Sequence, residues 1–231
     1  MLPGINSGLT GLRNNTNRLN IAAGNIANIN TPSFKKLELA DKSAQNSGVR
    51  RSSLQGTTYP TGNPLDLSIN GEGFFRVTTP EGGNAYTRRG TFSKDQEGRL
   101  VDSNGNRLSP EIVVPHNASS VSVSANGNVT ANVEGKETNL GKVEITIFNN
   151  PSGLTESNGL FFESASSGQA VSGSPGDGAQ GSISAGMIES SNVDITEEII
   201  DMIVAKHGYS ANIKAIKASD EMLGTTLNLK A

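Results

Sequence analysis

The stretch ITEEIIDMIVAKHGYSANIKAIKASDEMLGTTL, residues 195–227, decides the fold. A side chain recurs every three or four residues along it at ten positions, eight of them apolar: Ile195, Ile199, Met202, Lys206, Tyr209, Ile213, Ile216, Asp220, Leu223 and Leu227. Such a repeat keeps one side of an α-helix facing a partner helix and is typical of a coiled coil. At about 1.5 Å per residue the helix is about 50 Å long, which is too long for an ordinary globular core. The pattern therefore predicts a helix that needs a partner.

The residues at the start of this stretch carry the signals of a helix N-terminus. Asp194 stands at the N-cap position, and Glu197 three residues later completes an Asp-x-x-Glu form of the capping box. Glu198 and Asp201 add negative charge at the positive end of the helix dipole. The helix is expected to begin at Ile195.

The first thirty residues repeat the same spacing, at Ile5, Leu9, Leu12, Thr16, Leu19, Ala23 and Ile26. The simplest way to bury two matching apolar stripes is to pack the two helices against each other. Eight Asn and four Gly in residues 1–30 oppose the helix, by a summed propensity on the order of 5 kcal/mol. We therefore hypothesise that this segment is disordered in the monomer and folds on assembly. Thr31-Pro32 is expected to end the helix.

The middle of the chain changes to a period of two, which is typical of strands. Turn dipeptides punctuate it at Asn70-Gly71, Gly82-Gly83, Asn104-Gly105 and Asn126-Gly127. Predicted strands are Leu65–Ile69, Phe74–Thr78, Ala85–Arg88, Leu100–Asp102, Ile112–Val114, Val121–Val123, Asn128–Val133, Lys142–Phe148 and Ser182–Ser184, with 164–181 a Ser/Gly-rich loop.

Together these patterns predict an α+β fold, in which an antiparallel all-β domain is inserted between terminal helices paired as a coiled coil. The expected organisation is an N-terminal helix over residues 1–32, a connector over 33–64, the β domain over 65–185, and a C-terminal helix over 186–231 that packs on the first.

Composition excludes several classes of function. A net charge of −3 and a pI near 5.5 argue against nucleic acid as the partner, and the pairs Arg50–Arg51 and Arg88–Arg89 are expected to be solvated. The chain has no Cys, hence no thiolate nucleophile and no Cys-bound zinc. No run is apolar enough to span a bilayer, and the beginning of the chain does not resemble a cleavable secretory signal.

No set of residues favours catalysis, a cofactor or a metal site. His116 and His207 stand far apart in sequence and have no second ligand at helical spacing. Asp102, Asn104 and Asn106 share the spacing of the first calcium ligands of an EF-hand loop. The required Gly and the final Glu are absent, so a hairpin turn accounts for these residues better.

The apolar stripes can pack the two terminal helices of one chain together or pack against neighbouring subunits. Three observations favour packing between subunits. The apolar arc widens at Ile200, Ile203 and Val204, small residues such as Ala205 and Gly208 permit close approach, and the N-terminal helix is weak by itself. The predicted assembly interface is Ile5, Leu9, Leu12, Leu19, Ile26, Ile195, Ile199, Met202, Tyr209, Ile213, Ile216, Leu223 and Leu227.

Four blocks carry a family resemblance. LNIAAGNIANINTPSFKK (19–36) resembles the N-terminal signature of flagellar rod and hook proteins, and TGNPLDLSINGEGFFRV (61–77) resembles that of their rod subfamily. YTRRGTFSKDQEGRLVDSNGNRL (86–108) and the tail 183–229 are similar to the family's next block and its C-terminal helix. The chain thus resembles the flagellar basal-body rod proteins, distal or proximal, and more distantly the hook protein. Residues 37–60 look shorter than in the distal rod proteins, which leaves the position in the rod open.

The resemblance implies a non-enzymatic subunit that is exported unfolded by the flagellar type III apparatus. It implies a homo-oligomeric helical filament in the basal body, in contact with other rod and hook subunits and not inserted in the membrane. The alternative is a secreted adhesin that trimerises through its coiled coil. A closed trimer in dilute solution would favour the adhesin, and a monomer with mobile ends would favour the rod subunit.

Overall fold

The computed structural model describes residues 2–40 and 48–228 and divides the chain into two compact units. The helical unit comprises Met1–Asn30, Lys35–Ser53 and Asn192–Ala231, and the β unit comprises Thr31–Phe34 and Leu54–Ser191. Both ends of the chain therefore belong to one unit, as the matching stripes predict.

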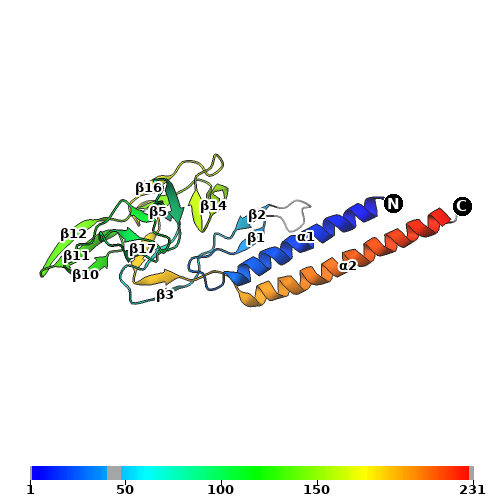
Figure 1. The fold of residues 1–231 in the computed structure, drawn as a ribbon, viewed down its shortest axis with the longest axis horizontal. Coiled ribbons are helices and arrows are strands. Elements are labelled where there is room, and N and C mark those ends of the chain that lie inside the picture. The colour runs from blue at the N-terminus through cyan, green and yellow to red at the C-terminus, as the bar shows by residue number, and fades with distance from the viewer. Residues whose placement is uncertain (1, 41–47, 229–231) are drawn as a thin grey trace. The chain divides into compact units, whose positions relative to one another are not determined.

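The helical unit is built from α1 (Leu2–Ala27) and α2 (Ile195–Asn228), which lie side by side and run in opposite directions (Figure 1). The predicted N-cap of α2 is confirmed, because Asp194 Oδ1 accepts the backbone N–H groups of Thr196 at 2.7 Å and Glu197 at 3.3 Å. The α+β fold class with paired terminal helices is confirmed.

The first helix ends at Ala27, before the predicted stop at Thr31-Pro32. The N–H of Asn28 bonds to the carbonyl of Asn25 at 3.1 Å, and the N–H of Ile29 bonds to that of Ile26 at 3.3 Å. These bonds span three residues and tighten the chain into a turn, which is how helices commonly end. Asn28 is a poor helix former, so the turn begins ahead of the proline.

A short hairpin, β1 (Leu37–Leu39) and β2 (Val49–Arg51), completes the helical unit. Its strands pair antiparallel, with Leu37 opposite Arg51 and Leu39 opposite Val49. The sequence pattern places no strand in this connector, because three-residue strands of mixed polarity carry no clear alternation.

The β unit contains only antiparallel pairings between its described strands. The largest sheet has the order β14-β15-β6-β5-β9-β8-β7, with β13 bridging β5 and β16, while β10-β11-β12 form a second sheet. Two pairs, β17-β4 and β18-β3, join segments far apart in sequence. The strand bounds are β3 Thr58–Pro60, β4 Leu67–Asn70, β5 Phe74–Thr78, β6 Asn84–Thr87, β7 Ser93–Lys94, β8 Leu100–Val101, β9 Arg107–Ser109, β10 Ala118–Val123, β11 Asn128–Val133, β12 Lys136–Lys142, β13 Ile145–Ile147, β14 Thr155–Ser157, β15 Leu160–Phe162, β16 Val171–Gly173, β17 Ser182–Ala185 and β18 Met187–Glu189; a short 3-10 helix spans Pro151–Gly153.

The core of the β unit comes from the alternate residues of these strands. Its buried side chains are Leu65, Leu67, Ile69, Phe75, Val77, Ala85, Phe92, Leu100, Leu108, Ile112, Val114, Val123, Val129, Val143, Ile145, Leu160 and Ile183. Phe75 meets Phe92 edge to face, with ring centroids 5.4 Å apart, a favoured aromatic geometry.

Two strand predictions and one loop prediction are wrong in part. Ile112–Val114 forms only an isolated bridge between Val113 and Arg99, because the flanking Pro110 and Pro115 lack N–H donors. The predicted strand 142–148 is split, since Lys142 ends β12 and β13 begins at Ile145. The predicted loop 164–181 contains β16, whose pairing to β13 a Ser/Gly-rich sequence does not reveal.

The turn predictions hold for backbone conformation. Gly82, Gly105 and Gly127 have positive φ and close the hairpins β5-β6, β8-β9 and β10-β11. Asn70-Gly71 instead connects β4 to β5, which lie in different sheets. Asp102 closes its own hairpin, as its Oδ1 accepts the N–H groups of Asn104 at 2.8 Å and Asn106 at 2.9 Å.

No helix among the described residues has the length and apolar content needed to cross a membrane.

Candidate assembly site

The two helices meet along a line of small and polar residues. A Cβ added at Gly8 would lie 2.6 Å from Ile216 Cγ1, and one added at Gly11 would lie 2.6 Å from the side-chain amide of Asn212. Next along the line, a Cβ added at Gly208 would lie 2.7 Å from Asn15 Oδ1. Such distances are below any ordinary carbon contact, so each glycine leaves room for a side chain of the facing helix that its own Cβ would otherwise occupy. The contact line continues through buried Ala22 and Ala205.

Most members of the predicted apolar stripes lie beside this contact line, and Ile216 is the member that lies on it, so the stripes pack on each other only in part. The contact positions of α1 (8, 11, 15, 22, 25) fall mostly one residue before its apolar stripe (9, 12, 16, 23, 26). In α2, Glu198, Ala205 and Gly208 likewise precede Ile199, Lys206 and Tyr209. One residue is a rotation of about 100°. The stripes therefore lie on the flank of the helix pair.

The predicted residues divide into two groups by exposure. Leu9, Ile195, Ile199 and Tyr209 are 37–47% exposed. The half-buried members are Ile5, Leu12, Leu19, Ile26, Met202, Ile213, Ile216 and Leu223; the side chain of Leu227 lies outside the described residues. Of all these residues, Ile216 reaches the contact line most directly, through Gly8.

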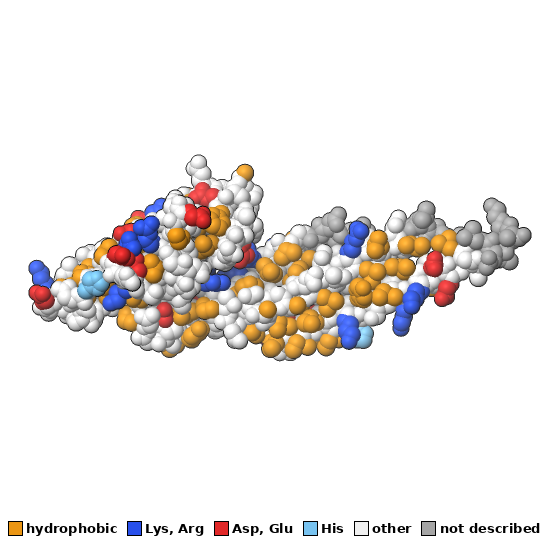
Figure 2. Space-filling view, in the orientation of Figure 1, with side chains coloured by type: hydrophobic (Ala, Val, Ile, Leu, Met, Phe, Trp, Pro, Cys, Tyr) orange, Lys and Arg blue, Asp and Glu red, His pale blue; other side chains and the backbone are white. Residues whose placement is uncertain are grey.

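Both stripes lie on the same side of the pair. Moving one residue along a helix rotates the direction of the side chain by about 100°. In two antiparallel helices viewed from one end, this rotation is clockwise in one helix and anticlockwise in the other. Two stripes that each follow the contact line by one residue consequently face the same way. Figure 2 shows hydrophobic side chains gathered along the helices on the face in view. We call this surface the open face and define it by Ile5, Leu9, Leu12 and Leu19 of α1 and Ile195, Ile199, Met202, Ile203, Tyr209 and Ile213 of α2.

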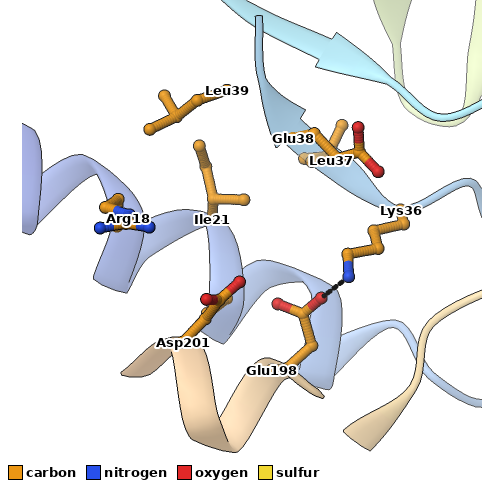
Figure 3. Close-up of a pocket in the computed structure, with 9 residues that line it drawn as sticks. Arg18, Ile21, Lys36, Leu37, Glu38, Leu39, Glu198 and Asp201 are labelled. Atoms are coloured by element: carbon orange, nitrogen blue, oxygen red, sulfur yellow. Dashed lines mark ion pairs between the residues drawn. The ribbon is translucent and has the colours of Figure 1, made fainter. Parts of the chain in front are cut away.

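The other side of the pair carries β1 near the start of α2. Ile21 precedes the contact residue Ala22 and so turns away from the open face. It points toward Leu39 of β1 in the small pocket of Figure 3, which Arg18, Glu38 and Asp201 also line. One side of the helix pair is thus covered there by the chain's own hairpin.

A buried ion pair holds β1 to α2 in this pocket. Lys36 Nζ lies 3.0 Å from Glu198 Oε1 and 2.9 Å from Glu197 Oε2, and the Glu198 side chain is 2% exposed (Figure 3). Burial alone would lower the pKa of Lys36, but its hydrogen bonds to Glu197 and Glu198 raise that pKa overall. Glu197, the predicted capping-box partner of Asp194, therefore directs its carboxylate to Lys36.

Two asparagines fix the backbone on either side of Lys36. Buried Asn25 donates to the carbonyl of Leu37 at 2.9 Å and accepts the N–H of Leu37 at 2.8 Å, as a neighbouring strand would. Asn192 Oδ1 accepts the N–H of Lys36 at 2.6 Å. The sequence prediction missed Asn25, Lys36, Asn192 and Glu198. For Asn25 and Glu198 the only signal is a polar residue at a helix position that faces a partner, whereas Lys36 and Asn192 lie outside the helices and carry no such signal.

Family models match three segments of the chain. Residues 5–35 match "Flagella basal body rod protein", residues 68–131 match "Flagellar hook protein FlgE/F/G D1 domain", and residues 184–229 match "Flagellar basal body rod FlgEFG protein C-terminal". The first and last matches fall on α1 with the start of the connector and on β17, β18 and α2.

Whole proteins align along the full chain. It is 36% identical over 264 aligned positions to flagellar basal-body rod protein FlgG of Bacillus subtilis, covering all of both chains. It is 35% identical to flagellar basal-body rod protein FlgG of Borreliella burgdorferi, covering 97% of this chain and 96% of that one. The flagellar hook protein FlgE of Helicobacter pylori is 35% identical over 61% of this chain but only 19% of its own length. In the Bacillus alignment, 264 positions against 231 residues leave 33 positions with no counterpart in this chain.

Proposed function

Because the chain belongs to the flagellar basal-body rod protein family, we propose that its open face is the surface through which subunits polymerise helically into the rod. The chain is a structural subunit of the flagellar basal body. Its neighbours in this proposal are further copies of itself and other rod and hook subunits. It has no catalytic role in the proposal, and it reaches the rod through the flagellar export apparatus.

The exposure of β-branched residues at the start of α2 carries the proposal. Ile195, Ile199 and Ile203 of the open face are 46–50% exposed near the start of α2. Each fully buried side chain of this kind stabilises by about 1.5–3 kcal/mol relative to its exposed form, so leaving three in water forgoes several kcal/mol. Contiguous apolar surface of this sort marks a protein interaction site.

The charges of the two helices support a second copy of this chain as the partner. The only charged residues of α1 are the cations Arg13 and Arg18, whereas α2 carries five carboxylates and three lysines, with the carboxylates grouped in its first turns and again at Asp220 and Glu221. Arg13 in α1 and Asp220 and Glu221 in α2 form no ion pair within residues 2–40 and 48–228. A neighbour displaced along the helix axis can bring the basic helix of one copy to the acidic turns of another. Contacts between different surfaces of identical subunits generate an open helical filament.

The composition of α1 supports export before folding. Its Asn and Gly residues make the isolated helix unfavourable, and its contact with α2 buries small or polar groups, so little holds it in place before assembly. A segment ordered only by its neighbours is compatible with passage through a narrow export channel.

The test is assembly in a strain that lacks its own copy of this rod subunit. Complementation with the double variant Ile199→Asp/Ile203→Asp should give no complete basal bodies by electron microscopy, because each filament contact would bury uncompensated carboxylates. Val171→Asp makes the same change at an exposed residue of β16 in the β unit and should leave assembly intact. Complete rods built from the double variant would contradict the proposal.

A further inference from the structure

The contact line between the helices contains two matching Gly–Asn pairs. Asn15 lies against Gly208 of the other helix, and Asn212 lies against Gly11. Each asparagine also donates its side-chain N–H to the carbonyl four residues earlier, Asn15 to Gly11 at 2.8 Å and Asn212 to Gly208 at 2.9 Å. The same five-residue module, a glycine with an asparagine four positions later, thus faces a second copy of itself in antiparallel orientation.

In the observed alignment of the two helices, each asparagine side chain fills the space that a glycine of the other helix leaves open. A slide of one helix along the other by a heptad removes this match. A slide of α2 by one heptad in one direction would place Asn15 opposite the region of Ile216, where two side chains compete for one space. A slide in the other direction would place Gly8 opposite Gly208 and leave the space between the backbones unfilled. Overpacking and cavities both destabilise, so each slipped alignment is disfavoured.

We propose that the contacts Gly11–Asn212 and Asn15–Gly208 determine the register of the terminal helices. Single polar residues within a helix–helix contact are known to specify register at a cost in stability. The apolar stripes cannot perform this task, because most of their members lie beside the contact line. The register aligns the α1 and α2 parts of the open face; this consequence rests on the proposed function, whereas the register itself does not.

The experiment reads the register with a cysteine pair, since the chain has no cysteine of its own. A Cβ at Gly4 would lie 3.6 Å from Ser219 Oγ, so Gly4→Cys/Ser219→Cys should form an intrachain disulfide on mild oxidation only in this register. The full chain carrying this pair is expressed in the deletion strain. Cross-linking is scored by gel mobility in purified basal bodies, and a variant that forms no basal bodies scores zero.

Two variants and a control decide the outcome. Gly11→Ala should lower the cross-linked fraction several-fold, because its methyl group meets Asn212, and adding Asn212→Ala should restore much of the loss. Gly24→Ala makes the same change in α1 with no atom within 4 Å of the new Cβ and should have no effect. The pair Gly208→Ala and Gly208→Ala/Asn15→Ala should repeat the pattern from the other helix.

The proposal is overturned if Gly11→Ala cross-links as well as Gly24→Ala, or if neither asparagine replacement restores the loss. Failure of the proposed function has a separate signature, namely normal assembly of the Ile199→Asp/Ile203→Asp variant. The two results are independent of one another.

Discussion

Arg88 joins three carbonyls and one carboxylate inside the β unit. Its guanidinium donates to the carbonyls of Gly73 at 2.5 Å, Gly71 at 2.6 Å and Ile69 at 3.0 Å, and its Nε donates to Glu189 Oε2 at 3.1 Å. The expectation that Arg88–Arg89 is a solvated pair is therefore wrong for Arg88, which is 9% exposed. The five donors of arginine are what allow one side chain to satisfy so many acceptors.

Replacing Arg88 is expected to destabilise the β unit strongly. Arg88→Met would remove the ion pair that Arg88 makes with Glu189, whose side chain is 1% exposed. The expected loss in the free energy of unfolding is about 3–5 kcal/mol. Denaturant unfolding of the purified chain measures it, with Arg89→Met, at the half-buried neighbouring position, as the control. Equal effects of the two variants would contradict this role for Arg88.

Lys36 has the corresponding role in the helical unit. Lys36→Met should destabilise the junction of β1 with α2 by about 2–3 kcal/mol, because Glu198 stays buried without its cation. Amide exchange of residues 195–205 measures the effect. Lys206→Met, at an exposed lysine of the same helix, should change little. Addition of Glu198→Gln to Lys36→Met should recover part of the loss, and a failure to recover would point to lost packing instead of a stranded charge.

Asp194 makes the start of α2 sensitive to acid. Hydrogen bonds from the backbone N–H groups of Thr196 and Glu197 lower the pKa of Asp194 below its ordinary value of 3.8. A lowered pKa in the folded state means that this stabilisation is complete above pH about 4 and is lost as the pH falls through the folded-state pKa. Exchange of the first amides of α2 should therefore accelerate below pH about 4. Asp194→Asn, whose amide does not titrate, should lack this step; an identical pH profile in both chains would refute the assignment.

At the scale of elements, the spacing of apolar residues predicts the two long helices but not the residues through which they meet. The stripe from Ile195 to Leu227 identifies α2 because a period of 3.5 is a property of a single helix. The contact line depends on Gly8, Gly11 and Gly208, which carry no hydrophobic signal. The fit of a side chain against a glycine of the other helix is a property of the pair, so a pattern read on either helix alone assigns the larger side chains to the contact.

The strands show the same division between local and paired properties. Phe74–Thr78 and Asn128–Val133 are predicted with their observed bounds, because buried and less buried side chains alternate along each of them. The strand β12, Lys136–Lys142, is missed because its first four side chains are exposed and polar. Its extended conformation comes from pairing with β11, and the residues of β12 alone show no pattern that predicts this pairing.

The first helix is expected to be only marginally stable in the monomer. Amide exchange in dilute solution should show weak protection for residues 5–26 and strong protection for the core strands of the β unit. The physical reason is the adverse propensity of α1 combined with a contact line that buries few apolar side chains. Strong protection of residues 5–26 in dilute monomer would contradict both this expectation and the proposed folding on assembly.

At the scale of the whole molecule, the two units are stabilised in different ways. The β unit has an apolar core of its own, with seventeen buried side chains in one cluster. The helical unit instead buries small and polar residues between its helices and leaves larger ones, such as Ile199, Ile203 and Tyr209, at its surface. We therefore expect the β unit to fold by itself and the helical unit to be completed by neighbouring subunits.

The central claim is that the open face is buried by neighbouring subunits, and cysteine labelling tests it most directly. Ile203→Cys introduces the chain's only thiol, at a residue that is 50% exposed. Its reaction with a maleimide is compared in the purified monomer and in assembled basal bodies, with denatured chain as the reference for full reaction. We predict rapid labelling in the monomer and strong protection in the rod. Equal labelling in the two states would show that the open face stays exposed in the rod and would contradict the account.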